Sequence, residues 1–161
     1  MKQTEVTKEK KSSDLQAVDI YDLILEEHKP LKQLIKILKD PEKPIEDRQA
    51  AYAEFAPMLI SHAKPEEQTL YVYMKREDDT RIEALEGEIE HKLAEEMIGR
   101  IEKVDDPDLW TAKVKVLAEL VEHHIKEEES EFLPDFKKET AKEERVNLGA
   151  LYLKLKKQLQ H

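Results

Sequence analysis

Two histidine–glutamate pairs recur in the sequence at one spacing, His62-x-x-x-Glu66 and His124-x-x-x-Glu128. On a helix, side chains four residues apart lie on one face with Cβ atoms about 5–6 Å apart, so each pair can bind one metal ion. The carboxylate of each pair can also reach across to a second ion. Because the chain contains no cysteine, any metal must be held by nitrogen and oxygen ligands of this kind.

Four of the six histidines lie on apolar helix faces that should point into the protein, one on each of four predicted helices. Two of these faces also contain a glutamate, and a buried carboxylate is costly unless something neutralises it. The predicted ligand set therefore contains six residues: His28, His62, Glu66, His91, His124 and Glu128. His123 points about 100° away from His124 and, like the terminal His161, is expected at the surface.

Two other interpretations of the pairs stay open. They could be buried salt bridges in a helical interaction module that binds no metal. They could also belong to a ferritin-like di-metal carboxylate oxidase, although that class uses paired Glu-x-x-His motifs and only Glu88-x-x-His91 is present. The identical spacing of the two pairs favours a metal site.

Prolines and acidic residues divide the chain into the helices that must position these side chains. Asp19 and Asp106 are the predicted N-caps of the first and fourth helices, and Pro134 is expected to follow the end of the fourth. Pro30, Pro57 and Pro65 should kink their helices rather than end them, because the apolar periodicity continues across them. The predicted helices cover about residues 20–39, 45–75, 81–104 and 107–132, and a fifth amphipathic helix closes the chain.

This pattern predicts an all-α protein, an up-and-down four-helix bundle with an additional C-terminal helix. The expected organisation is a polar N-terminal tail over residues 1–18, the bundle over 19–139, and an amphipathic helix packed on it over 140–161.

The third helix has two candidate inner faces. Its stronger apolar stripe lies opposite His91 and consists of Ile82, Leu85, Ile89, Leu93 and Met97. A second stripe of small and apolar residues contains His91, together with Ala84, Gly87, Ala94 and Ile98. We expect the second stripe to face the site and the C-terminal helix to cover the first.

Composition excludes several functions. The 161 residues suffice for one domain, and 40% of them are charged, with a net charge of −10 that argues against nucleic-acid binding. The absence of cysteine excludes disulfides, thiolate nucleophiles and cysteine-ligated clusters. No apolar stretch approaches a membrane span and no signal core opens the chain, so a cytoplasmic protein without a membrane partner is expected.

The order His28, His62-x-x-x-Glu66, His91, His124-x-x-x-Glu128 resembles the hemerythrin family, in its HHE cation-binding branch. The resemblance covers about residues 19–134. It implies a four-helix bundle around a non-haem di-iron centre with an oxo or hydroxo bridge, in which both glutamates bridge the metals and the histidines divide between them. Manganese or zinc would suit the same ligands.

Two departures distinguish the chain from the oxygen carriers that it resembles. Gly87 stands where the carriers have a further histidine, and Glu128 follows His124 by four residues where they place an aspartate at five. Four histidines and two bridging glutamates supply eight of the twelve bonds that two octahedral ions need, and a bridging oxide supplies two more. We therefore expect two open positions, one beside Gly87, unless Glu88 or Glu95 fills it.

These features predict a metal-binding or sensing protein rather than a dedicated enzyme. Its expected partner is a small molecule such as O2, NO or peroxide, or else it handles iron.

Overall fold

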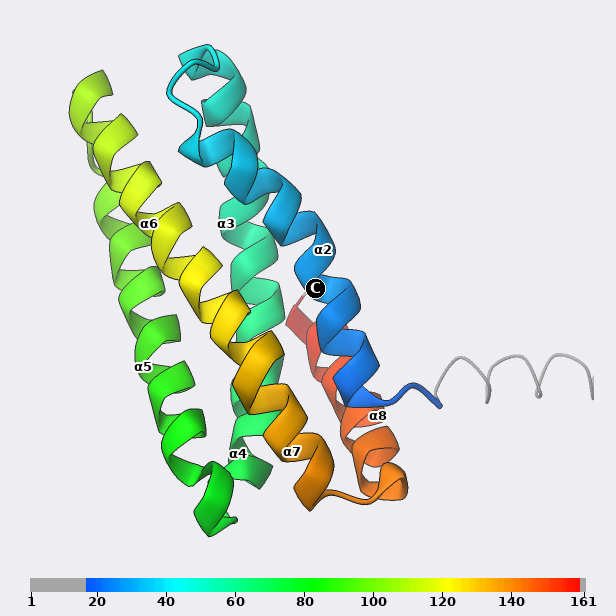
Figure 1. Ribbon diagram of the computed structural model, residues 1–161. Coiled ribbons are helices and arrows are strands. Elements are labelled where there is room, and N and C mark those ends of the chain that lie inside the picture. The colour runs from blue at the N-terminus through cyan, green and yellow to red at the C-terminus, as the bar shows by residue number, and fades with distance from the viewer. Residues whose placement is uncertain (1–16, 160–161) are drawn as a thin grey trace, which may run out of the picture.

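The computed structural model describes residues 17–159, and these are almost entirely helical. All but the last two residues of the predicted N-terminal tail lie outside this range, as does His161. Four long helices run side by side: α2 (Ile20–Lys39), α3 (Ile45–Gln68), α5 (Asp78–Ile101) and α6 (Pro107–Glu127) (Figure 1). The prediction of an all-α, up-and-down four-helix bundle is confirmed.

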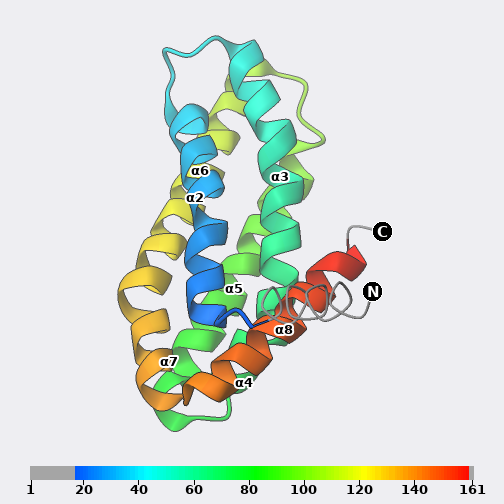
Figure 2. The ribbon, with the colours of Figure 1, turned by 90° about the vertical axis from the view of Figure 1, so that its right-hand side faces the viewer.

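Shorter helices continue the chain at one end of the bundle. The helix α4 (Leu70–Met74) follows α3, and the π-helix η1 (Glu128–Phe132) leads from α6 into α7 (Leu133–Glu139). The additional C-terminal helix, α8 (Lys142–Leu159), packs against α2 and α3 (Figure 2). None of the helices within residues 17–159 combines the length and the apolar character needed to span a membrane.

Aspartate caps begin two of the helices, as predicted. The Asp19 carboxylate accepts a hydrogen bond from the backbone N–H of Tyr21 at 2.9 Å, and the Asp106 carboxylate accepts one from Leu109 at 2.9 Å. Both bonds satisfy N–H groups that have no partner inside the first helical turn. Pro107 follows as the first residue of α6, where no N–H is required.

The second predicted helix does not run unbroken to Lys75. It continues through Pro57 and Pro65, as expected, but it ends at Gln68, and Thr69 leaves helical geometry with φ −121° and ψ −82°. The Thr69 hydroxyl donates to the carbonyl oxygen of Pro65 at 2.7 Å, an acceptor that a regular helix would pair with the Thr69 backbone N–H. A threonine within an apolar periodicity gives no stop signal, so the break could not be predicted.

The predicted end of the fourth helix near Phe132 is wrong as well. The chain passes through the wider turn of η1, in which the Leu133 N–H bonds to the carbonyl oxygen of Glu128. Pro134 then lies in the first turn of α7, directly after the wider turn of η1. The chain therefore stays helical to Glu139.

Helix α5 turns its small-residue stripe inward, as predicted, although it begins at Asp78 and ends at Ile101, earlier than expected. The buried residues of this stripe are Ala84, Gly87, His91, Ala94 and Ile98. The expectation that the C-terminal helix covers the opposite stripe is wrong. Ile82, Ile89 and Leu93 are 70%, 60% and 48% exposed, because α8 packs on α2 and α3 instead.

Contacts with the start of α2 fix the position of α8. Gly149 lies so close to the backbone of Val18 that a Cβ atom at this position would clash with the Val18 carbonyl oxygen. The Arg145 guanidinium donates to the Asp19 carboxylate at 2.8 Å, and Tyr152 is fully buried. These tertiary contacts decide which helices α8 covers, and helical periodicity cannot reveal them.

Two apolar clusters fill the bundle above and below one polar level. One cluster, here called the distal cluster, lies near the loops that join α2 to α3 and α5 to α6. It is formed by the halves of these four helices next to the loops, and it includes Leu31, Phe55 and Leu117. The α8-side cluster includes Phe132 and Tyr152 and completes the opposite end. His28 and His91 each fall in sequence between members of the two clusters on their own helices, Ile24 and Leu31 on α2 and Ala84 and Ala94 on α5, so the site lies between two apolar layers.

The glycine environments predict opposite stability effects for two Gly→Ala substitutions. Gly149→Ala should lower the free energy of unfolding by about 1–3 kcal/mol, because the new methyl group meets backbone atoms that cannot move aside cheaply. Gly99→Ala, with nothing within 4 Å of the added atom, should raise it by about 0.5–1 kcal/mol through helix propensity. Urea unfolding measures both values, and equal effects of the two substitutions would contradict the position of α8.

Candidate metal centre

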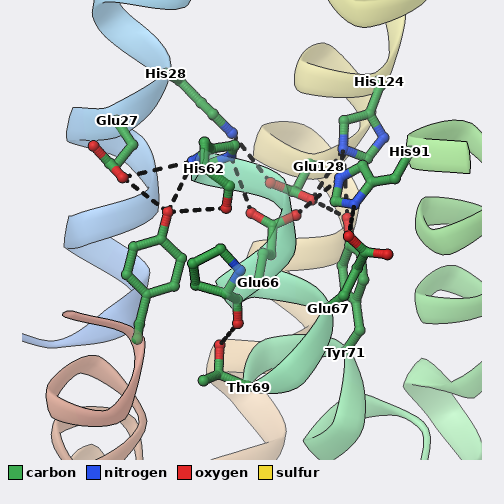
Figure 3. Close-up of polar contacts among 12 residues, drawn as sticks. Glu27, His28, His62, Glu66, Glu67, Thr69, Tyr71, His91, His124 and Glu128 are labelled. Atoms are coloured by element: carbon green, nitrogen blue, oxygen red, sulfur yellow. Dashed lines mark hydrogen bonds and ion pairs between the residues drawn. The ribbon is translucent and has the colours of Figure 1, made fainter. Parts of the chain in front are cut away.

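The six predicted ligands meet at one level of the bundle, as Figure 3 shows. Each long helix contributes one histidine, and α3 and the start of η1 contribute the glutamates. All six side chains belong to residues that are at most 5% exposed: His28, His62, Glu66, His91, His124 and Glu128. His123, by contrast, lies at the surface with 66% of its side chain exposed.

Glu66 lies between two histidines from different helices. One of its carboxylate oxygens is 3.2 Å from Nε2 of His62, one turn earlier on α3. The other is 3.3 Å from Nε2 of His91 on α5. The two oxygens of this carboxylate therefore face opposite sides of the site.

Glu128 repeats this arrangement. Its oxygens lie 3.1 Å from Nε2 of His28 on α2 and 3.3 Å from Nε2 of His124 on α6. The result is two groups of four potential ligands that share both glutamates: His28, His62, Glu66 and Glu128 on one side, and Glu66, His91, His124 and Glu128 on the other.

The outward nitrogens of two histidines are held by carboxylates. His28 Nδ1 lies 3.0 Å from a Glu129 oxygen, and His124 Nδ1 lies 2.9 Å from a Glu90 oxygen. A histidine whose Nδ1–H donates to a carboxylate presents the lone pair of Nε2 inward, which is the form that binds a metal.

The other two histidines have comparable outer partners. His91 Nδ1 lies 3.5 Å from a Glu67 oxygen. His62 Nδ1 lies 3.1 Å from the hydroxyl oxygen of Tyr152, which donates to Glu27 at 2.8 Å. The helix α8 is therefore part of the site, because its tyrosine orients a predicted ligand.

Helical periodicity did not predict these outer partners, although the sequence contains a signal for the four carboxylates. Each outer glutamate is the direct sequence neighbour of a predicted ligand: Glu27, Glu67, Glu90 and Glu129. Helical periodicity separates such neighbours by about 100°, which makes them surface residues on an isolated helix. In the bundle, the same rotation places their carboxylates beside the outward nitrogen of a histidine.

The chemistry of the donor set fits a cation. Both oxygens of Glu66, one oxygen of Glu128 and the Nε2 atoms of His28 and His62 are buried without a hydrogen-bond partner in the described residues. If the histidines are neutral and donate through Nδ1 to the outer carboxylates, their Nε2 lone pairs face the lone pairs of Glu66 and Glu128, and these repel each other. The centre therefore needs positive charge between them, either as protons or as metal ions. Two divalent cations carry the same charge as the four protons that four histidines would take up.

The potential at the centre is strongly negative. Burial disfavours protonation of His62 and His124, yet Glu66 and Glu128 outweigh it and raise the pKa of His62 to about 9 and that of His124 to about 10. Burial opposes ionisation of Glu128 too, but the neighbouring His124 and His28 hold its pKa well below the usual value. A centre with this potential attracts positive charge of either kind.

Tyr71 fills the space beside Gly87, so the predicted open position there is wrong. A Cβ atom on Gly87 would lie 2.5 Å from the Tyr71 hydroxyl oxygen. That hydroxyl donates to Glu128 at 2.5 Å and lies 3.4 Å from Nε2 of His124. The break at Thr69 precedes Tyr71, and an irregular connection of this kind hides the direction of the side chain from helical periodicity.

Glu88 and Glu95 do not reach the centre either. A Glu88 oxygen forms an ion pair with Nζ of Lys75 at 2.5 Å. A Glu95 oxygen forms one with Nζ of Lys64 at 2.6 Å. Both carboxylates therefore belong to the partly exposed rim of α5.

The raised histidine pKa values predict how the stability of metal-free protein depends on pH. Because the pKa values of folded His62 and His124 lie above the unfolded value of about 6.5, their contribution is fully present below that pH. It is lost as pH rises through about 9 and 10, which leaves Glu66 and Glu128 buried without counter-charges. Urea unfolding of chelated protein should therefore give a lower free energy of unfolding at about pH 10 than at about pH 7.

Metal-loaded protein is the control for this measurement. A histidine that binds a metal ion is already neutral, so the stability of this form should fall less over the same range if these histidines are the ligands. An equal fall in both forms would contradict the assignment to these histidines.

Comparison with known proteins agrees with this geometry. The sequence pattern of one family, described as the hemerythrin HHE cation binding domain, matches residues 19–136, which contain all six predicted ligands. No curated protein and no solved structure gave a significant match to the chain. Since the family match covers well over half of the 161 residues, the chain belongs to the hemerythrin family of HHE cation-binding proteins.

Proposed function

We propose that the protein holds two metal ions, chiefly iron, in a non-haem di-iron centre formed by His28, His62, Glu66, His91, His124 and Glu128. The observation that carries the proposal is the sharing of both glutamates by the two four-residue groups. A carboxylate whose two oxygens face different histidine pairs is suited to bridge two ions. Each ion would then have two histidines of its own.

The proposed activity is the binding or sensing of a small molecule such as O2, NO or peroxide. A bound iron pair would supply redox chemistry and open coordination positions for such a molecule. The space beside His91 and His124 supports a small partner, because the cavity there measures about 10 Å³, the order of one water molecule. Its lining is mainly apolar and includes Leu59, Ala63 and Val121.

The residues of the chain would control access and protons at this centre. Tyr71 keeps its proton, because burial and the charges of Glu128 and Glu66 raise its pKa well above the usual value. Its hydroxyl therefore acts as a fixed donor beside Glu128. The distal cluster and the α8-side cluster exclude bulk water from both sides. Iron storage or delivery is a second candidate, since it needs only the metal site.

The other two classes have less support. The single Glu-x-x-His motif, Glu88-x-x-His91, does not supply the ligand pair of a ferritin-like oxidase, since Glu88 pairs with Lys75 at the rim. A metal-free interaction module remains an outcome of the experiment that follows.

Metal analysis after desalting tests the proposal. We expect two tightly retained ions per chain, mainly iron, and their near-ultraviolet absorption. His124→Ala should remove most of the retained metal, whereas His123→Ala should keep it, because only His124 points into the centre. Retention of one ion or none by freshly prepared wild type, or equal losses in the two variants, would contradict the proposed centre.

The position of Tyr71 predicts the response to an added ligand. Tyr71→Phe removes the hydroxyl that donates to Glu128 and fills the space beside Gly87. Azide should bind the iron-loaded variant about five- to tenfold more tightly than wild type, the equivalent of about one hydrogen bond. Optical titration at matched iron content measures this difference.

Tyr73→Phe is the matched control, since Tyr73 packs edge-on against Phe136, outside the six-ligand group. It should leave azide affinity unchanged. If Tyr71→Phe and Tyr73→Phe behaved alike, Tyr71 would have no part in ligand access.

A further inference from the structure

A second group of metal-ligating side chains lies outside the buried centre. Glu90 from α5 and His123 and Glu127 from α6 bring one ligand atom each to within 4.8 Å of one another. His123 Nε2 lies 3.4 Å from a Glu127 oxygen. The side chain of His123 is 66% exposed, whereas those of Glu127 and Glu90 are only 28% and 16% exposed. The group therefore opens to solvent on one side only.

This outer group repeats part of the buried centre with a displacement of one residue. Its three members directly precede three of the inner residues: His91, His124 and Glu128. Helices α5 and α6 pack against each other. A shift of one residue turns a side chain by about 100° around its helix, so His123, Glu127 and Glu90 lie on the outer side of the contact whose inner side holds His124, Glu128 and His91.

Within the described residues, the carboxylates of the outer group, Glu90 and Glu127, form ion pairs with histidines and not with lysine or arginine. Most other partly buried carboxylates near the centre, such as Glu88 and Glu95, are neutralised by lysine.

We propose that Glu90, His123 and Glu127 form an outer site for an exchangeable divalent cation. One imidazole and two carboxylates are ligands that suit Mn²⁺, Fe²⁺ and Zn²⁺, and the exposed side leaves room for water in the remaining positions. With three protein ligands and access to solvent, the outer site holds its ion more weakly than a closed site would.

Glu90 connects the outer site to the buried one. Its Oε1 atom lies 2.9 Å from Nδ1 of His124 while its carboxylate belongs to the outer group. Only the Glu90 side chain therefore separates a cation at the outer site from His124, a proposed ligand of the inner centre. The outer site would be the place where an ion binds first before it enters the inner centre. This entry role, unlike the outer site itself, rests on the proposed function.

Titration with Mn²⁺, followed by the electron paramagnetic resonance signal of free Mn²⁺, tests the outer site on protein that carries its tightly bound metal. We expect about one exchangeable Mn²⁺ per chain. His123→Ala and Glu127→Gln should each weaken its binding by roughly tenfold or more, since each removes one of three ligands. Glu131→Gln is the matched control, because it makes the same charge change on the same acidic surface without removing a ligand, and it should change affinity by less than about twofold.

The outcomes separate a built site from general attraction. Equal weakening by Glu127→Gln and Glu131→Gln, with no effect of His123→Ala, would show a diffuse acidic surface and overturn the proposal, as would the absence of exchangeable Mn²⁺. Metal retained through desalting reports only on the buried centre. Its absence, together with Mn²⁺ binding that depends on His123, would reject the proposed function and support the outer site.

The entry role has its own readout. Metal-depleted His123→Ala should take up iron several-fold more slowly than depleted wild type and reach the same final content. An unchanged rate of uptake would overturn the entry role.

Discussion

Two carboxylates without access to water, Glu66 and Glu128, are the constraint on which the rest of the bundle depends. Isolated, either charge would be strongly destabilising in the core, so each is flanked by two histidine nitrogens at 3.1–3.3 Å. The histidines are held by an outer layer of glutamates, and lysines at the surface neutralise part of that layer, as Lys32 does at Glu129 and Lys156 at Glu27. Acidic and basic groups thus alternate from the centre outward, and the outer contacts orient the inner donors.

The chain departs from regular α geometry at or just after each of the two glutamates. Helix α3 ends two residues after Glu66, and the π-helix η1 begins at Glu128 itself. The first irregularity is followed by Tyr71, whose hydroxyl reaches Glu128. Insertions of π geometry are frequent at functional sites, where they redirect side chains that a regular helix would point elsewhere. Because of the irregular geometry at Thr69, Tyr71 fills the space beside Gly87, which the sequence had predicted to be open.

Local rules were sufficient for the inner residues and insufficient for their surroundings. Apolar periodicity and residue spacing predicted the helices, the aspartate caps and the burial of four histidines and two glutamates. Each of these features depends on one helix at a time. The outer partners depend on how helices approach each other: Glu90 reaches His124 across α5 and α6, and Tyr152 reaches His62 from a helix whose position is set by Gly149. No pattern within a single segment contains that information. The exposed stripe of α5 and the helical path through Pro134 were mispredicted for the same reason, since apolar spacing and a proline have different consequences in different surroundings.

The central claim is that this cluster is built for two cations that share both glutamates. Crystals of the iron-loaded protein, measured on both sides of the iron absorption edge, test it most directly. The account predicts two anomalous-scattering peaks, one beside His28 and His62 and one beside His91 and His124, with Glu66 and Glu128 contacting both. A single peak, or none with the histidines paired directly to the glutamates, would contradict it.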